Sequence, residues 1–326
     1  MRFAMQSGML SLVAALAVAL PVFAQSDLDQ LISEQQDSLL ATYKHLHEHP
    51  ELSTQEKETS ALIAEDLRKL GYEVTDHFGQ YDDPGLRAYG IVAVLHNGPG
   101  PVVYVRTELD ALPIVENTGL PYASHVKVKR ADGTEVGVMH ACGHDLHMTV
   151  FLGTARVLTE LKNRWSGTVV MIGQPAEETV GGAKAMIRAG LFTKFPRPDY
   201  VLALHDSAAV AAGKVSWRAG TLLAGADSVD ITVRGYGGHG AAPQVTKDPI
   251  VIASEIVVML QTIVSREMDP QLPTVVTVGS FHAGTKNNII PDEAKLQLTV
   301  RTMNPEQREK VLAAIARITN GVAAAA

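Results

Sequence analysis

The chain has 326 residues, of which 46% are hydrophobic and 19% charged, a balance typical of a globular protein that buries a sizeable core. Its net charge of −7 argues against a nucleic-acid partner, because a surface that binds phosphates needs an excess of Lys and Arg. A single cysteine excludes a disulfide within the chain, so this thiol is inert, links two chains, acts as a nucleophile or binds a metal.

The N-terminus has the pattern of a secretory signal peptide. Arg2 precedes an apolar run at residues 9–20, and PVFA follows before Gln25. A basic start, about a dozen apolar residues and a small-x-small end are typical of a cleaved leader, whereas a membrane-spanning helix needs roughly 20 apolar residues. An uncleaved anchor is the alternative. We expect residues 1–24 to be removed, the protein to be periplasmic or secreted, and no later stretch to span a membrane.

Helices and strands alternate through the first part of the chain. The helical segments carry apolar residues three and four positions apart, and the strand segments are short apolar runs rich in β-branched residues. This alternation predicts the α/β class, with a mostly parallel sheet covered by helices. The expected helices are 27–46, 59–70, 148–161 and 182–189, and the expected strands are 90–96, 102–106, 168–172 and 200–204, the last of them buried.

The pattern changes after about Trp217. A strand, a helix, two strands and a helix follow in that order, which is the order of a ferredoxin-like unit without its last strand. We therefore predict a first domain at 25–217 and a second, smaller α+β domain at 218–326. The expected strands of the second domain are 228–233, 274–281 and 294–302, and its expected helices are 249–266 and 306–325.

Three stretches near the ends of predicted strands offer metal ligands. Cys142 and His144 are separated by one residue, Glu177 and Glu178 follow a predicted strand, and His205 follows the strand VLAL. Open α/β sheets build their sites at strand ends, and a thiolate, two imidazoles and a carboxylate suit zinc or a similar divalent ion. Each feature alone is more often structural, but their shared placement favours a metal site. The rival interpretation is Cys142 as a nucleophile with a histidine base.

The two adjacent glutamates predict a division of roles. Neighbouring side chains point in different directions, so one carboxylate can bind the ion while the other faces a water molecule. A divalent cation lowers the pKa of a bound water towards roughly 7, and a nearby carboxylate can take its proton. The pair Glu177–Glu178 supplies both acids.

A series of motifs runs in order through the chain. MHACGHDLHM and QPAEE are the most specific, and they stand among LHEHPELS, VRTELDALP, GGHGAAP, NNIIPD and VRT. The ordered set resembles a family of metal-dependent amidohydrolases and peptidases that includes hippurate hydrolase, N-acyl-amino-acid amidohydrolases and plant indoleacetyl-amino-acid hydrolases. The resemblance implies a zinc-aminopeptidase-like catalytic domain with a lid or dimerisation domain. It also implies hydrolysis of N-acyl or N-aroyl amino acids by metal-activated water; a dipeptidase or carboxypeptidase activity, or an inactive chain that keeps the fold, is the alternative.

The resemblance assigns the metal centre residue by residue. It implies that Cys142, His144, Glu178 and His205 hold one or two divalent ions per subunit, and that Glu177 is the general base. Zinc or manganese is the expected metal, with cobalt or nickel as alternatives.

The resemblance also assigns residues around the metal. Asp110 would orient the site, and His239 in GGHGAAP would stabilise the oxyanion, reaching into the partner subunit of a homodimer. Asn288 and Arg301 match positions that contact the substrate, Arg301 as a clamp for a carboxylate. Apolar residues surround much of the helix at 251–259, which adds to the expectation of a dimer through the second domain.

The sequence departs from the family's motifs at two places, and its HLHEHP segment is not expected to bind the metal. Thr107 and Glu108 stand where relatives usually have alanine and aspartate, a conservative change. The family supplies a further ligating histidine near its C-terminus, and no histidine follows His282, so we expect a C-terminally truncated member of the family. The three histidines of HLHEHP are expected to be structural, because positions i, i+2 and i+4 do not share one helical face.

Overall fold

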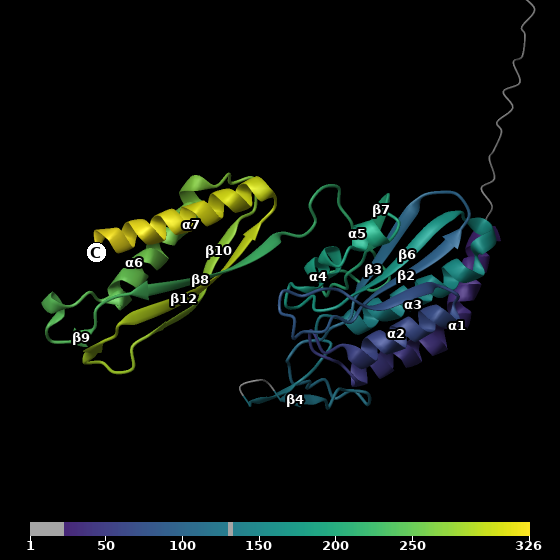
Figure 1. Cartoon of the computed structure of the whole chain (residues 1–326), viewed down its shortest axis with the longest axis horizontal. Helices are drawn as coiled ribbons and strands as arrows, with labels where there is room; N and C mark the ends of the chain where they lie inside the picture. Colours follow the sequence, from purple (N-terminus) through teal and green to yellow (C-terminus); the bar gives the residue numbers. More distant parts are fainter. Residues whose placement is uncertain (1–22, 130–132) are drawn as a thin grey trace, which may run out of the picture. The chain divides into compact units, whose positions relative to one another are not determined.

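The computed structural model divides the chain into two compact units, residues 1–209 and 210–326 (Figure 1). It describes residues 23–129 and 133–326. The division lies within 204–224, a segment without helix or strand, which also contains the predicted boundary between 217 and 218. The predicted signal peptide falls on residues 1–24, and all of these except the last two lie outside the described residues.

Unit 1 is built on a five-stranded mixed sheet. In sheet order the strands are β1 (Glu73–Phe78), β2 (Gly90–Asn97), β6 (Gly167–Gln174), β3 (Val102–Glu108) and β7 (Tyr200–Ala203). β3 pairs in parallel with β6 and β7, whereas β2 runs antiparallel to both β1 and β6. The α/β class is confirmed, but only the β6-β3-β7 side of the sheet has parallel pairing. A separate hairpin joins β4 (Lys127–Lys129) to β5 (Glu135–Gly137).

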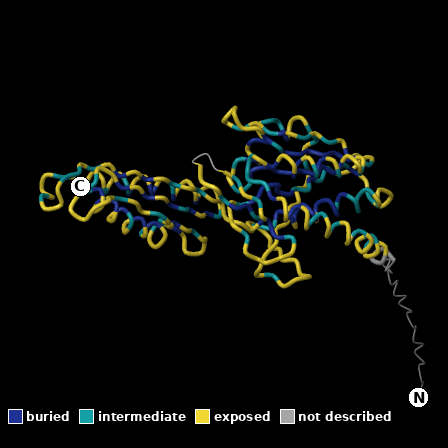
Figure 2. The backbone as a smooth tube through the Cα atoms, turned by 90° about the horizontal axis from the view of Figure 1, so that it is seen from below, coloured by how far each residue is buried: buried dark blue, intermediate teal, exposed yellow. Residues whose placement is uncertain are grey.

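Helices cover both faces of this sheet. One face carries α1 (Phe23–Glu48), α2 (Lys57–Lys69) and α3 (His144–Glu160), and the other carries α4 (Gly182–Arg188) and α5 (Leu191–Lys194). Alternate residues of β2 face opposite layers: Ile91 packs in the α1–α3 cluster and Val92 in the α4–α5 cluster. The central strands β2 and β6 therefore form a buried layer between the helices, part of the dark blue tube in Figure 2.

The prediction of a buried strand at 200–204 is wrong. Tyr200, Val201 and Leu202 are 64%, 58% and 58% exposed. β7 is the edge strand of the sheet and pairs with β3 alone, and neither core cluster of unit 1 includes any of its residues. An apolar strand is buried on both faces only when other elements cover it.

Unit 2 is a three-stranded antiparallel sheet with two helices on one face (Figure 1). In sheet order the strands are β10 (Val275–Ala283), β12 (Glu293–Thr302) and β8 (Gly225–Arg234). The helices are α6 (Pro249–Thr262), extended by a π-helical turn at Ile263–Glu267, and α7 (Pro305–Ala325). Burial alternates along β12 with a period of two, so one face of the sheet packs on the helices. The order of the three long strands and the two helices is the one predicted from the sequence.

The apolar helix of unit 2 corrects one expectation. Pro249–Glu267 is long and apolar enough to cross a membrane by length and composition, although no later stretch was expected to be. Its residues Ile252, Ile256 and Leu260 pack into the core of unit 2. A helix that buries one face in this way is built as the core helix of a folded domain.

The core of unit 1 gives a test of this packing. Leu152→Ala in α3 removes a side chain with 0% exposure and should lower the free energy of unfolding by about 2–5 kcal/mol. Val150→Ala in the same helix, at an exposed position, should change it by less than about 0.5 kcal/mol. Urea unfolding followed by circular dichroism measures both, and equal losses would contradict the packing of α3.

Candidate metal centre

The ends of several secondary-structure elements bring the predicted ligands of unit 1 together. Cys142 precedes α3, His144 begins it, and His205 follows β7. Gly143, between the first two, has φ +76°, and a Cβ there would lie 2.5 Å from an Asp206 carboxylate oxygen. Glycine adopts this left-handed conformation without strain, and it turns the chain from Cys142 into the helix.

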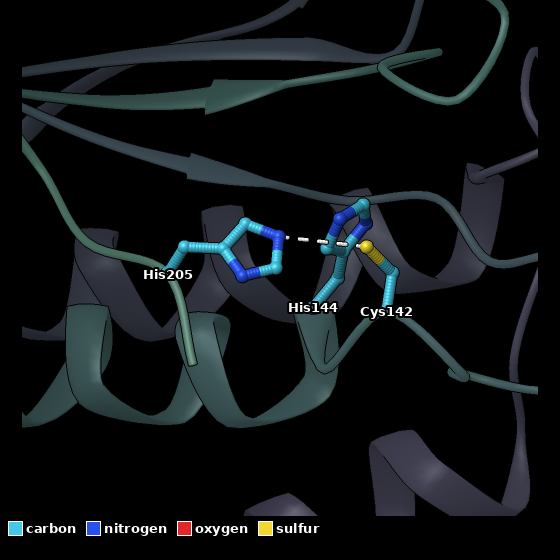
Figure 3. A group of neighbouring side chains, drawn as sticks. All are labelled: Cys142, His144 and His205. Carbon is cyan, nitrogen blue, oxygen red and sulfur yellow. Dashed lines mark hydrogen bonds between the residues drawn. The ribbon is translucent and has the colours of Figure 1, made fainter. Parts of the chain in front are cut away.

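Cys142, His144 and His205 form a group that could hold a metal. Their side chains converge from the start of α3 and from the segment after β7 (Figure 3). One ligand atom from each lies within 4.8 Å of the others, and Cys142 Sγ is 3.5 Å from His205 Nε2. Soft sulfur and imidazole ligands at these separations suit zinc.

Glu177 and Glu178 approach the same histidine from the turn after β6. His144 Nε2 lies 3.8 Å from Glu177 Oε2 and 4.0 Å from Glu178 Oε1. Within the part of the chain that the structure describes, His144 Nε2 and Glu178 Oε1 are buried without any hydrogen-bond partner. Zinc binds such nitrogen and oxygen ligands at about 2.0–2.2 Å. The pair of unpartnered atoms therefore fits a shared divalent cation, and the predicted ligand set meets around His144.

Asp110 fixes the orientation of His144 and of the glutamate turn. Its main-chain oxygen accepts a hydrogen bond from His144 Nδ1 at 2.7 Å, which leaves the lone pair of Nε2 free for a metal. Its Oδ2 accepts hydrogen bonds from Ser53 Oγ at 2.6 Å and from the Glu178 N–H at 3.0 Å. Burial acts to raise the pKa of Asp110, but the donors around it hold that pKa below its ordinary value. The carboxylate is therefore ionised, and Asp110 contacts both His144 and the glutamate turn.

The thiol of Cys142 is a poor nucleophile in the absence of a cation. Burial raises its pKa to about 12, and the Glu178 carboxylate adds to this effect. The thiolate is the reactive form of cysteine, and also the form that binds metals. The electrostatics therefore favour the ligand interpretation, because a bound cation supplies the positive charge that a thiolate needs here.

His147 carries a second set of contacts that the sequence analysis missed. Its Nε2 accepts the N–H of Asp206 at 3.0 Å, so its Nδ1 carries the proton and donates to Glu108 Oε2 at 3.0 Å. His147 also lies within reach of His144 and His205, but both of its nitrogens are already used. The residue therefore holds the chain next to His205 in place.

The HLHEHP segment at the end of α1 contributes no member to these candidate ligand groups. Only His47 of its three histidines is buried, and its ring contacts Asp145 Oδ2 at 2.6 Å and Glu116 Oε1 at 3.1 Å. These contacts join α1 to the start of α3. The geometry is that of a structural histidine.

The other predicted residues belong to unit 2. His239 lies in the short strand β9 (Gly238–His239), opposite Ile289 of β11 (Ile289–Ile290), and the main-chain oxygen of Asn288 accepts the Gly240 N–H at 2.9 Å. His239 and Asn288 are therefore neighbours, and both are exposed. Arg301 lies near the C-terminal end of β12, paired with Ala226 of β8, whereas Asn288 precedes the N-terminal end of that strand. The structure therefore does not group Arg301 with His239 and Asn288.

Comparison with known proteins places the chain in a family. Residues 104–315 match the model of peptidase family M20/M25/M40. The chain is 42% identical to the hippurate hydrolase of Campylobacter jejuni over 281 residues, covering 86% of this chain and 68% of the relative. It is 40% identical to thermostable carboxypeptidase 1 of Saccharolobus solfataricus over 293 residues, covering 89% and 70%.

A solved structure agrees with this assignment. The Bacillus subtilis protein YXEP, described as a dinuclear metal binding peptidase from the M20 family, matches with a TM-score of 0.70 and 34% identity, covering 90% of this chain and 71% of that one. The chain belongs to peptidase family M20/M25/M40 and is a hydrolase of amide bonds with the fold of a metal-binding peptidase. The family predicted from the ordered motifs is confirmed.

The raised pKa of Cys142 gives a test of its role. In metal-free protein at pH 8, a thiol with a pKa near 12 is ionised to on the order of 1 part in 10,000. Iodoacetamide should therefore alkylate Cys142 at least about 100-fold more slowly than it alkylates N-acetylcysteine, as measured by mass spectrometry. A rate close to that of N-acetylcysteine would favour the nucleophile interpretation.

Proposed function

We propose that this protein hydrolyses the amide bond of N-acyl or N-aroyl amino acids with a divalent cation held by Cys142, His144, Glu178 and His205. The observation that carries the proposal is the unpartnered pair of His144 Nε2 and Glu178 Oε1, together with the Cys142 thiol and the His205 imidazole, whose ligand atoms lie within 4.8 Å of a ligand atom of His144. The 42% identity to a hippurate hydrolase supports the choice of substrate class.

Each residue of the site then has a chemical task. A cation held by these ligands would supply the positive charge that polarises the amide carbonyl and lowers the pKa of a water molecule. Glu177, whose carboxylate lies beside His144 and is partly exposed, takes the proton of the attacking water and returns it to the departing amine nitrogen. Asp110 keeps His144 in the tautomer that presents Nε2. The motif resemblance is the basis for assigning His239 to the oxyanion and Asn288 and Arg301 to the substrate, with Arg301 as the clamp for the substrate's carboxylate.

The metal is proposed to be zinc or manganese, one or two ions per subunit. A thiolate with two imidazoles suits zinc, and the glutamates suit either ion. Cobalt and nickel accept the same ligands. Metal analysis of protein purified without chelator identifies the native ion.

A carboxypeptidase activity is the second candidate, because thermostable carboxypeptidase 1 is 40% identical to this chain. Both reactions release an amino acid by cleaving the amide at its nitrogen, and the same metal centre serves both. The two activities differ in the group that lies on the acyl side of the cleaved amide. Hydrolysis of benzoyl- and acetyl-amino acids in preference to N-blocked dipeptides supports the amidohydrolase, and the reverse preference supports the carboxypeptidase.

Substitutions of the two glutamates are predicted to have different effects. Glu177→Gln should retain metal and lower kcat by about 100-fold or more, because a general base is lost. Glu178→Gln should instead lower the amount of metal that remains after dialysis, because a ligand is lost. Metal analysis and hippurate hydrolysis measure the two effects. Equal metal loss in both variants would overturn the division of roles.

We also propose a homodimer through unit 2. α6 and α7 border a groove of about 870 Å³ whose lining includes Val251, Val258, Met259 and Val322. Val251 and Val258 are 53% and 68% exposed, and a contiguous apolar surface of this kind marks an interaction site. A second copy of the chain can cover it through the same helices.

A charge in this groove should separate the subunits. Val258→Asp is expected to convert the dimer to a monomer in analytical ultracentrifugation at micromolar concentration, because the carboxylate loses its water in the interface. Thr277→Asp is the control and should remain a dimer, because Thr277 is exposed on the face of the unit 2 sheet that carries no helices. A wild-type protein that sediments as a monomer would refute the interface.

A further inference from the structure

Glu56 is a buried carboxyl group that the proposed mechanism does not use. It immediately precedes α2, and its side chain has 0% exposure. Its Oε1 accepts two main-chain hydrogen bonds, from the Thr54 N–H at 2.9 Å and from the Ala176 N–H at 2.7 Å. The second bond joins the start of α2 to the turn after β6, where Glu177 and Glu178 lie.

Both donors of these hydrogen bonds have an unfavourable backbone conformation. Thr54 has φ +68° and Ala176 has φ +45°, in the left-handed region that residues with a Cβ rarely adopt. Such a conformation persists only when surrounding contacts hold it. Ala176 is itself buried, and its main-chain oxygen accepts the N–H groups of Gly181 and Gly182. The conformation of Ala176 therefore sets the course of the whole turn.

Glu177 lies between two anchored positions of this turn. On one side Ala176 is bound by the Glu56 carboxyl, and on the other the Glu178 N–H is bound by Asp110. Ser53, in the same segment as Glu56, donates to that Asp110 carboxylate. A short segment before α2 therefore contacts both anchors of the glutamate turn.

We propose that Glu56 is a positioning residue for the general base: its carboxyl oxygen holds Ala176 in the left-handed conformation and thereby aims Glu177 towards His144. The inference rests on the proposed function for the role of Glu177. Glu178 has its own anchor at Asp110, so loss of the Glu56 contact displaces the base more than the metal ligand. Glu56 therefore acts mainly on the general base, whereas Asp110 supports both the base and the metal ligand.

Substitutions of Glu56 separate the hydrogen bond from the charge. Glu56→Gln keeps an oxygen that accepts both N–H groups, whereas Glu56→Ala removes it. Burial raises the pKa of Glu56 to about 7, so the neutral amide is a close substitute for a carboxyl that is partly protonated at neutral pH. Ile63→Ala, which truncates a fully buried side chain of α2, controls for a general loss of stability.

The kinetic experiment uses the full chain, loaded with zinc or manganese, and hippurate. Glu56→Ala should lower kcat about 10- to 100-fold, the scale expected for a misplaced catalytic group, with KM and bound metal unchanged. Glu56→Gln and Ile63→Ala should retain roughly half of kcat or more at a temperature where all variants are folded. In a Glu177→Gln background, Glu56→Ala should cause no further loss, because the group that it positions is already absent.

A crystal structure of Glu56→Ala gives a result that does not depend on turnover. Ala176 is expected to leave the left-handed region and the Glu177 carboxylate to move away from His144, while Glu56→Gln keeps both. Ala176 at positive φ in Glu56→Ala, or a full additional loss of kcat in the Glu177→Gln background, would overturn the inference. If Glu177→Gln alone leaves kcat unchanged, or if no hippurate is hydrolysed, the proposed function fails instead, and the structure of Glu56→Ala still decides whether Glu56 holds the turn.

Discussion

Asp110 is fully buried directly after β3, and its hydrogen bonds hold the other segments of the site in place. Its main-chain oxygen receives His144, and its carboxylate receives Ser53 and the N–H of Glu178. Burying a carboxylate costs free energy unless several donors surround it. Removal of one donor should therefore destabilise the ionised form of Asp110 and, with it, the other hydrogen bonds that Asp110 makes. The loop before α2, the start of α3 and the turn after β6 are therefore expected to assemble together.

The fold was predictable where apolar periodicity is strong and was missed where it is weak. α3 and the central strands have uninterrupted apolar patterns, and they form where expected. β1, with the sequence EVTDHF, was missed because its mostly polar residues pair with β2 at the edge of the sheet. The burial of β7 was predicted wrongly because an apolar run shows that a segment can be buried, but not that another element covers it.

The candidate site was predictable in its residue types and not in its supporting contacts. Cys142, His144 and His205 stand out because metal-ligating residues cluster at predicted strand ends. Glu56 and His147 carry no comparable signal, because their partners lie at contacts that only the folded chain creates, Ala176 for the first and Asp206 for the second. Sequence patterns identify candidate ligands by residue type, whereas supporting residues are defined by their contacts and distances in the folded chain.

The burial and the negative charges around Cys142 and Glu178 explain why this site suits a cation and opposes thiol chemistry. Burial raises the pKa of Glu178 despite the opposing effect of His144, and burial together with the Glu178 charge raises the pKa of Cys142. A divalent ion held by the proposed ligands would reverse the balance, because its charge would favour the ionised form of each ligand at once. Metal binding and ligand ionisation are thus one coupled event, and a free thiolate nucleophile has no comparable source of stabilisation here.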